Sequence, residues 1–213
     1  MDYIAARRLE EKERRRSDIL DAARRVAEDS GIEGLTMEQV AREARLSRGL
    51  LYIYFRDRTD LHLGLCERAL AMLHEQFVGA GVANPRGVDK LTAMGRAYVD
   101  FSRDHPVYFE ALARFQASDA PDAEAEGNLR ACLQAGARVH ELMTEALQAG
   151  MCDGSISKTV GEPNTVAISL WALMHGAIQI ARMKGAVLAQ HGVTAAGLVE
   201  QALRIATVAL AKS

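Results

Sequence analysis

Proline, cysteine and aromatic residues are all scarce in this chain of 213 residues, which has four prolines, three cysteines and 5% aromatics. The cysteines, Cys66, Cys132 and Cys152, are scattered and form no C-x-x-C pair. This argues against a disulfide framework and a structural zinc site, and it suits a reducing cytoplasm. We therefore expect a cytoplasmic protein with no resident metal or other cofactor.

Long apolar runs are also missing. No stretch reaches the roughly 18 uninterrupted apolar residues that a membrane span needs, and the charged N-terminus has no apolar core of a signal peptide. We therefore expect a protein that is neither exported nor inserted into a membrane. β-branched runs are few as well, whereas Ala, Leu, Arg and Glu are abundant, so the composition predicts an all-α fold.

The net charge of −2 argues on its face against a nucleic-acid partner. Residues 1–60 are neutral overall, with 13 basic and 13 acidic side chains, but residues 42–58 hold five arginines and two acids. A local basic excess of this kind is weak evidence for a polyanionic partner.

The first helix is predicted from about Ser17, because apolar residues then recur at helical spacing until Ser30 and Gly31 stop it. Residues 1–16 form a charged arm. Its alternating charges fit either a solvated extension of that helix or a flexible basic tail, and the sequence leaves both possibilities open.

Two short capped helices follow. Thr36-Met37-Glu38-Gln39 has the form of a capping box, which predicts a helix from Met37 to about Ala44. Ser47 supplies a second N-cap, so another helix starts at Arg48. Two such helices joined by a three-residue turn form a helix-turn-helix over residues 36–55.

The remainder reads as further helices, for a total of about nine. Pro106 suits the first position of one of them, and Thr194 caps the last. Breaks are expected at 81–86, at 118–122 and, as the longest loop, at 150–164. The predicted helices after the helix-turn-helix span about 58–79, 88–103, 106–117, 129–150, 163–185 and 194–211.

In a helix-turn-helix the second helix enters the major groove of DNA. Arg48 is placed to grip guanine, and Gly49 allows the backbone close to the duplex. Ser47 and the hydroxyls of Tyr52 and Tyr54 suit contacts with phosphates. Leu50 is expected at the border between the groove and the protein core, and Leu51 and Phe55 are expected in the core. Structural alternatives remain, with Tyr54 as a packing residue and Arg48 as a merely solvated one. The candidate DNA-contacting residues are Thr36, Arg45, Ser47, Arg48, Gly49, Leu50, Tyr52, Tyr54 and Arg58.

Residues 19–61 resemble the N-terminal domain of the TetR family of bacterial transcriptional regulators. The matching features are Ile19-x-x-Ala-Ala, Gly31, Leu35-Thr36, Val40-Ala41, Leu46-Ser47, Gly49, Leu51-Tyr52-x-Tyr54-Phe55 and Asp60-Leu61. The resemblance implies a DNA-binding domain over residues 1–60 and an effector-binding and dimerisation domain over 61–213. It also implies a homodimer formed through the last two helices, a palindromic operator, a ligand-modulated regulator and, most often, a repressor.

Two positions depart from the family pattern. Arg45 stands where the family usually has Gly in a turn that often needs a left-handed backbone, at a cost of about 1 kcal/mol. Contact of Arg45 with phosphate would offset that cost. Arg58 stands where the family tends to have Lys, and the positive charge is retained.

Aromatic and methionine side chains concentrate in the region where similar regulators bind an effector. Such a cluster with few polar groups suits an apolar ligand, although residues of these types at helical spacing are more often plain core. Trp171 to Gly176 also resembles a Trp-x-x-x-His-Gly element of such regulators, for which a structural role is favoured over ligand binding. The candidate ligand-binding residues are Met72, His74, Tyr98, Phe101, Phe109, Met143, Trp171 and His175.

Rival functions have less support. No G-x-S-x-G, phosphate loop, H-E-x-x-H or dinucleotide motif is present, so we expect no enzyme. His62 and Cys66 are spaced to hold one face of a metal, but no third ligand is evident. The alternative to a DNA-binding regulator is a helical protein-interaction adaptor whose arginines serve an acidic partner. Neither the effector, the operator nor the choice between repression and activation follows from the sequence.

Overall fold

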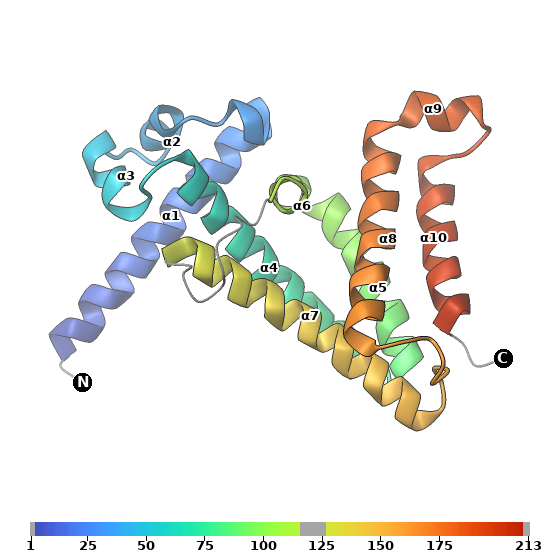
Figure 1. The fold of residues 1–213 in the computed structure, drawn as a ribbon. Helices are drawn as coiled ribbons and strands as arrows, with labels where there is room; N and C mark the ends of the chain where they lie inside the picture. The colour runs from blue at the N-terminus through green and yellow to red at the C-terminus, as the bar shows by residue number, and fades with distance from the viewer. Residues whose placement is uncertain (1–2, 116–126, 211–213) are drawn as a thin grey trace. The chain divides into compact units, whose positions relative to one another are not determined.

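The computed structural model of the chain describes residues 3–115 and 127–210. Within these two ranges there are ten α-helices and no strand, which confirms the all-α expectation (Figure 1). The predicted break at 118–122 lies outside the described residues. In chain order the helices are α1 (Tyr3–Gly34), α2 (Met37–Glu43), α3 (Arg48–Tyr54), α4 (Arg58–Val82), α5 (Gly87–Asp104), α6 (Pro106–Ala113), α7 (Gly127–Asp153), α8 (Pro163–Met183), α9 (Gly185–Gln190) and α10 (Ala195–Leu210).

The chain divides into two compact units. The first comprises Met1–Ala69 and Val107–Leu133, and the second comprises Leu70–Pro106 and Gln134–Ser213. The helices α4 and α7 therefore each contribute residues to both units. This division by packing differs from the functional domains expected from the sequence, whose boundary after residue 60 stays a prediction.

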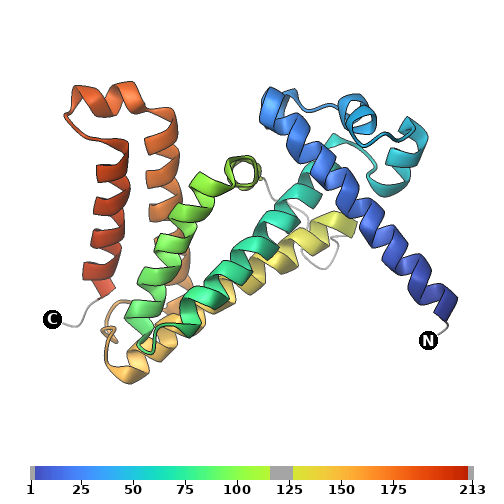
Figure 2. The ribbon, with the colours of Figure 1, turned by 180° about the vertical axis from the view of Figure 1, so that it is seen from behind.

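The core of the first unit joins α1, α2, α3 and the first turns of α4 (Figure 2). Gly64 of α4 makes this packing close, since a Cβ at that position would lie 2.8 Å from Cε1 of Phe55. The hydrophobic effect thus holds the two short helices, which are too short to be stable alone, on the longer ones. Fully buried side chains here are Ile19, Leu20, Val40, Leu51, Phe55, Leu61 and Leu65.

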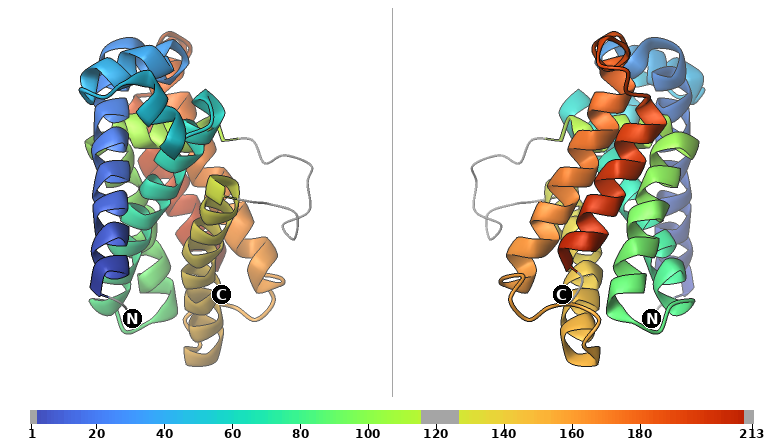
Figure 3. Two further views of the ribbon diagram at one scale, coloured as in Figure 1. Left: turned by 90° about the vertical axis from the view of Figure 1, so that its left-hand side faces the viewer. Right: turned by 90° about the vertical axis from the view of Figure 1, so that its right-hand side faces the viewer.

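In the second unit α8 and α10 lie side by side and run in opposite directions, and both contact α5 (Figures 1 and 3). The start of α5 crosses the end of α7 at two glycines. A Cβ on Gly87 would lie 2.3 Å from Cα of Gly150, and a Cβ on Gly150 would lie 2.4 Å from Cδ1 of Ile156. This crossing explains why Gly150 stays inside α7, where the sequence predicted the helix to end: another part of the chain fills the space that a side chain would occupy.

Two further differences from the expected helices concern the arm and the C-terminal region. Residues 3–16 are helical and form the first half of α1, so the arm is a helix extension and not a flexible tail. The backbone turns at Gly31 (φ 72°), where the sequence predicted the helix to stop. The helix α9 was not predicted: it has six residues and no side-chain cap, so no local signal announces it. Its presence raises the expected nine helices to ten within the described ranges.

The helix α8 is, among the described residues, the one whose length and apolar composition would suffice to cross a membrane. The expectation of no membrane span rested on uninterrupted apolar runs, and α8 is interrupted by polar residues such as His175 and Arg182. In this fold α8 packs on α10 and α5. Several other apolar side chains of α8 remain exposed to solvent, and packing within this chain does not account for their exposure.

Candidate nucleic-acid interface and effector site

The predicted capping box at the start of α2 is present. The backbone N–H of Gln39 donates to Oγ1 of Thr36 at 3.2 Å, and the backbone N–H of Thr36 donates to Oε1 of Gln39 at 3.0 Å. The Thr36 hydroxyl also donates to the same Oε1 at 2.6 Å. Thr36 is exposed, and its hydroxyl caps α2. A phosphate that contacts this hydroxyl would compete with Gln39 for it.

The turn between α2 and α3 is left-handed at Arg45, as the departure from glycine suggested. Arg45 has φ 55° and is the only non-glycine residue with a positive φ in the described ranges. The turn is closed by the N–H of Leu46, which donates to the carbonyl of Ala41 at 2.8 Å. The Arg45 side chain is exposed. A strained conformation is therefore retained by a residue whose guanidinium points to solvent.

The helix α3 is capped by Ser47, whose Oγ accepts from the N–H of Leu50 at 3.2 Å. One face of α3 is core, because Leu51 and the following Phe55 are fully buried. The other face is open to solvent. Its exposed residues are Ser47, Arg48, Gly49, Tyr52 and Ile53, with Leu50 and Tyr54 half-buried at the edges.

Ile53 is a candidate contact that the list drawn from the sequence left out. It is 73% exposed, although isoleucine is among the side chains most often buried. The sequence feature that could have identified Ile53 is its position four residues after Gly49, which puts both residues on one face of α3. An apolar side chain there suits the methyl group of thymine.

All five arginines between residues 42 and 58 are exposed, so the local basic excess lies on the surface. Arg58 also has a local role, because its Nη1 donates to the carbonyl of Glu33 at 2.8 Å and ties the start of α4 to the end of α1. Arg56 lies 3.7 Å from the buried carboxylate of Asp60. No ion pair involves Arg45 or Arg48 within the described part of the chain. These two guanidiniums are available to an anion.

In the second unit, three of the candidate effector residues come together. The Tyr98 hydroxyl lies 2.7 Å from Nδ1 of His175, and the ring centroids of Trp171 and His175 are 5.7 Å apart. Burial lowers the pKa of His175 and raises the pKa of Tyr98, so both groups are neutral at pH 7. Trp171 remains 50% exposed. These three residues form a small polar and aromatic group between α5 and α8.

The other candidates are not gathered around that group. Phe109 belongs to the first unit, and Phe101 is fully buried in the core of the second. Met72 and His74 lie two residues apart on α4 and therefore on different sides of the helix, so they do not face one cavity together. Met143 is half-buried on α7.

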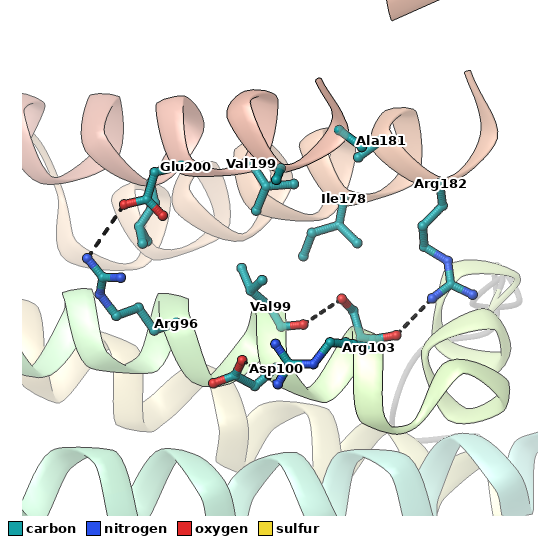
Figure 4. A pocket seen from close by; sticks show the side chains of 13 residues that line it. Arg96, Val99, Asp100, Arg103, Ile178, Ala181, Arg182, Val199 and Glu200 are labelled. Carbon is teal, nitrogen blue, oxygen red and sulfur yellow. Dashed lines mark hydrogen bonds and ion pairs between the residues drawn. The ribbon is translucent and has the colours of Figure 1, made fainter. Parts of the chain in front are cut away.

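A groove of about 690 Å³ lies between α5, α8 and α10 (Figure 4). Its apolar wall includes Val99, Ile178 and Val199, and ion pairs and hydrogen bonds border it. Arg96 lies 3.7 Å from Glu200, and Nη1 of Arg182 donates to the carbonyl of Ser102 at 2.8 Å. None of the candidate effector residues drawn from the sequence lines this groove.

The histidine and cysteine pair on α4 has other partners. Nε2 of His62 lies 2.9 Å from the carbonyl of Ala111 and 3.5 Å from Sγ of Cys66. The Cys66 thiol donates to the same carbonyl of Ala111 at 3.3 Å. The described residues contain no group of three His, Cys, Asp or Glu side chains that would hold a metal ion.

Two family models match most of the chain. The model described as "Bacterial regulatory proteins, tetR family" matches residues 19–64, and the model described as "Tetracyclin repressor-like, C-terminal domain" matches residues 91–206. Among curated proteins, YobS of Bacillus subtilis (strain 168), an uncharacterized HTH-type transcriptional regulator, is 27% identical over 93 residues. That alignment covers 44% of this chain and 48% of YobS, so this chain spans about half the length of that relative.

Solved structures cover more of the chain. A protein of unknown function from Rhodococcus sp. RHA1 has a TM-score of 0.72 at 25% identity and covers 93% of this chain and 95% of its own. SmeT, described as the repressor of the Stenotrophomonas maltophilia multidrug efflux pump SmeDEF, has a TM-score of 0.63 at 18% identity, over 93% of this chain and 91% of its own. The second likeness is one of fold alone.

Proposed function

Because this chain belongs to the TetR family of bacterial regulatory proteins, we propose that it binds a palindromic DNA operator as a homodimer and represses transcription until a small, mostly apolar ligand releases it. The observation that carries the proposal is the open face of α3. That face presents Arg48, Gly49, Tyr52 and Ile53 to solvent, while Leu51 anchors the opposite side in the core.

Operator reading follows from this arrangement. Arg48 is at the first position of α3, where a guanidinium reaches O6 and N7 of guanine in the major groove. Tyr52 and Ile53 supply apolar area for thymine methyl groups. Arg45 and Arg58, on either side of α3, suit phosphates, which position the domain without reading sequence.

Dimerisation is supported by the exposed apolar face of α8 and α10. Ile180 and Met183 of α8 are 47% and 67% exposed, and Ile205 and Val208 of α10 are 50% and 67% exposed. Large apolar side chains left exposed along two paired helices are typical of an interface. A second copy covering the same face would form a four-helix bundle and place two α3 helices one DNA turn apart, about 34 to 36 Å.

The effector site is proposed at Tyr98, His175 and Trp171, where two neutral polar groups lie among apolar side chains. A ligand regulates only if its affinity differs between the DNA-binding conformation and another one. Repression is the mode of action reported in the description of SmeT, and we extend it to this chain as part of the proposal.

The test is the selection of bound DNA from a random pool by the purified full chain, followed by a binding titration at several salt concentrations. We expect an enriched inverted repeat and an affinity that falls steeply with salt, as counterion release requires. Ile180→Glu should give monomers in analytical ultracentrifugation and lose the preference for two half-sites. A pool without enrichment, or binding insensitive to salt, would favour the protein-interaction adaptor instead.

A further inference from the structure

Asn128, in the first turn of α7, makes two hydrogen bonds with opposite roles. Its Oδ1 accepts from Nη2 of Arg16 at 2.8 Å, and its Nδ2 donates to Oδ1 of Asp60 at 3.1 Å. Arg16 precedes Asn128 by 112 residues and Asp60 precedes it by 68. A carboxamide suits this place because it can accept at one atom and donate at the other.

Both partners of Asn128 lead to the C-terminal end of α3. The other carboxylate oxygen of Asp60 accepts from the backbone N–H of Arg56 at 2.9 Å. The Arg16 guanidinium lies 5.5 Å from the centroid of the Phe55 ring, a cation–π arrangement. Phe55 and Arg56 are the two residues that directly follow α3. Two separate connections therefore run from Asn128 to the same two residues.

The Asp60 carboxylate of this network is buried, so its hydrogen bonds contribute strongly to its stability. Asp60 is only 6% exposed. Its charge is balanced by the Arg56 N–H, by Asn128 and by the Arg56 guanidinium at 3.7 Å. Arg16 is held in turn by Glu67 of α4 at 2.5 Å. A buried carboxylate that loses a donor carries a desolvation cost, so the absence of Asn128 would loosen the hold of Asp60 on Arg56.

We propose that Asn128 is a positioning residue for DNA reading: through Asp60 and Arg16 it holds residues 55 and 56, and with them α3, in the orientation that enters the groove. The inference rests on the proposed function in one respect, that α3 is the element that meets DNA. Without the amide, the end of α3 moves more freely, and DNA binding then has to restrict that motion at a cost in affinity. The hydrogen bonds of Asn128 to described residues go to Arg16 and Asp60, neither of which is a candidate interface residue, so the effect is indirect.

The test compares Asn128→Asp with the reciprocal double variant Asn128→Asp/Asp60→Asn in the full-length protein. Asn128→Asp removes the donor and places a second carboxylate beside Asp60, and we expect its Kd for the selected operator to rise about five- to twentyfold. In the double variant the amide at position 60 can still accept from the Arg56 N–H and now donates to position 128, which still accepts from Arg16. We therefore expect affinity to return to within about threefold of the wild type.

Two further measurements separate positioning from general damage. Gln134→Glu adds the same charge at an exposed place on α7 and should leave the operator Kd unchanged. Amide hydrogen exchange at Arg56 in the free protein should speed up in Asn128→Asp and slow again in the double variant.

Either of two results would overturn the positioning role. One is wild-type affinity and unchanged Arg56 exchange in Asn128→Asp; the other is a double variant no better than the single one. A wild-type protein that selects no DNA would instead remove the proposed function, and the exchange measurement would still show whether Asn128 holds Arg56.

Discussion

The Tyr98 hydroxyl and Nδ1 of His175 lie within hydrogen-bond distance, 2.7 Å apart, and so connect α5 to α8 inside the second unit. The two residues are 77 positions apart in the chain. Burial raises the pKa of Tyr98 and lowers the pKa of His175, so this hydrogen bond joins two neutral groups at pH 7. Protonation of His175 would place a positive charge at a partly buried site, which carries a desolvation cost.

The first prediction is a loss of stability on mild acidification. The pKa of His175 in the folded protein is lowered from its ordinary value of 6.5, so the unfolded chain binds the proton more tightly. The free energy of unfolding therefore falls as pH drops below about 6.5 and levels off below the folded pKa. In His175→Asn, which keeps a polar side chain but removes the group that titrates, urea titrations should show a flatter profile. A profile as steep as that of the wild type would contradict the assignment to His175; His62, whose pKa is also lowered by burial, contributes equally to both proteins.

A second prediction separates sequence reading from phosphate binding. Arg48→Ala should reduce discrimination between the selected operator and a scrambled duplex by about 1 to 3 kcal/mol. Arg58→Ala should weaken both duplexes alike and lower the salt dependence of binding. Fluorescence anisotropy titrations with both duplexes measure the difference. Unchanged operator binding by Arg48→Ala would remove the base-reading role of that residue.

Arg45 allows a test of strain against function. Since Arg45 holds φ at 55°, Arg45→Gly relieves a left-handed backbone, and we expect the unliganded protein to gain up to about 1 kcal/mol of stability. The same variant loses a positive charge beside α3 and should bind all DNA sequences less tightly. Arg45→Lys serves as the control, because it keeps both the charge and the strain. Stability equal to that of the wild type in Arg45→Gly would mean that the turn carries no net strain.

Two glycines of the same helix should respond in opposite directions to alanine. In Gly64→Ala the new Cβ would lie 2.8 Å from Phe55 and 3.1 Å from Leu20, both fully buried, so we expect a loss of about 1 to 3 kcal/mol. Gly79→Ala meets nothing within 4 Å and should gain about 0.5 to 1 kcal/mol from helix propensity. Thermal unfolding of both variants gives the comparison. A Gly64→Ala protein as stable as the wild type would show that Phe55 can shift without cost.

Features that depend on neighbouring residues were predictable from the sequence. Thr36 with Gln39 and Ser47 with Leu50 are pairs three residues apart, so the start of α2 and of α3 follows from local hydrogen bonds. The same holds for the turn at Arg45. The candidate face of α3 was largely predictable for the same reason, because helical spacing places Gly49, Tyr52 and Ile53 together and away from the buried Leu51.

Other features depend on which distant segments meet. The helix end expected at Gly150 was wrong because Ile156 packs where a side chain would be, and α9 escaped notice because it has no cap. The effector candidates were chosen by residue type and by resemblance to other regulators, and neither could show that Phe101 and Phe109 are buried core residues.

Local hydrogen bonding and helical periodicity therefore determined from the sequence alone that this is an all-α protein with a capped helix-turn-helix. Only the tertiary structure decided that Arg16, Asp60 and Asn128 meet behind that motif, because contacts between residues so far apart in the chain arise from the packing of whole helices.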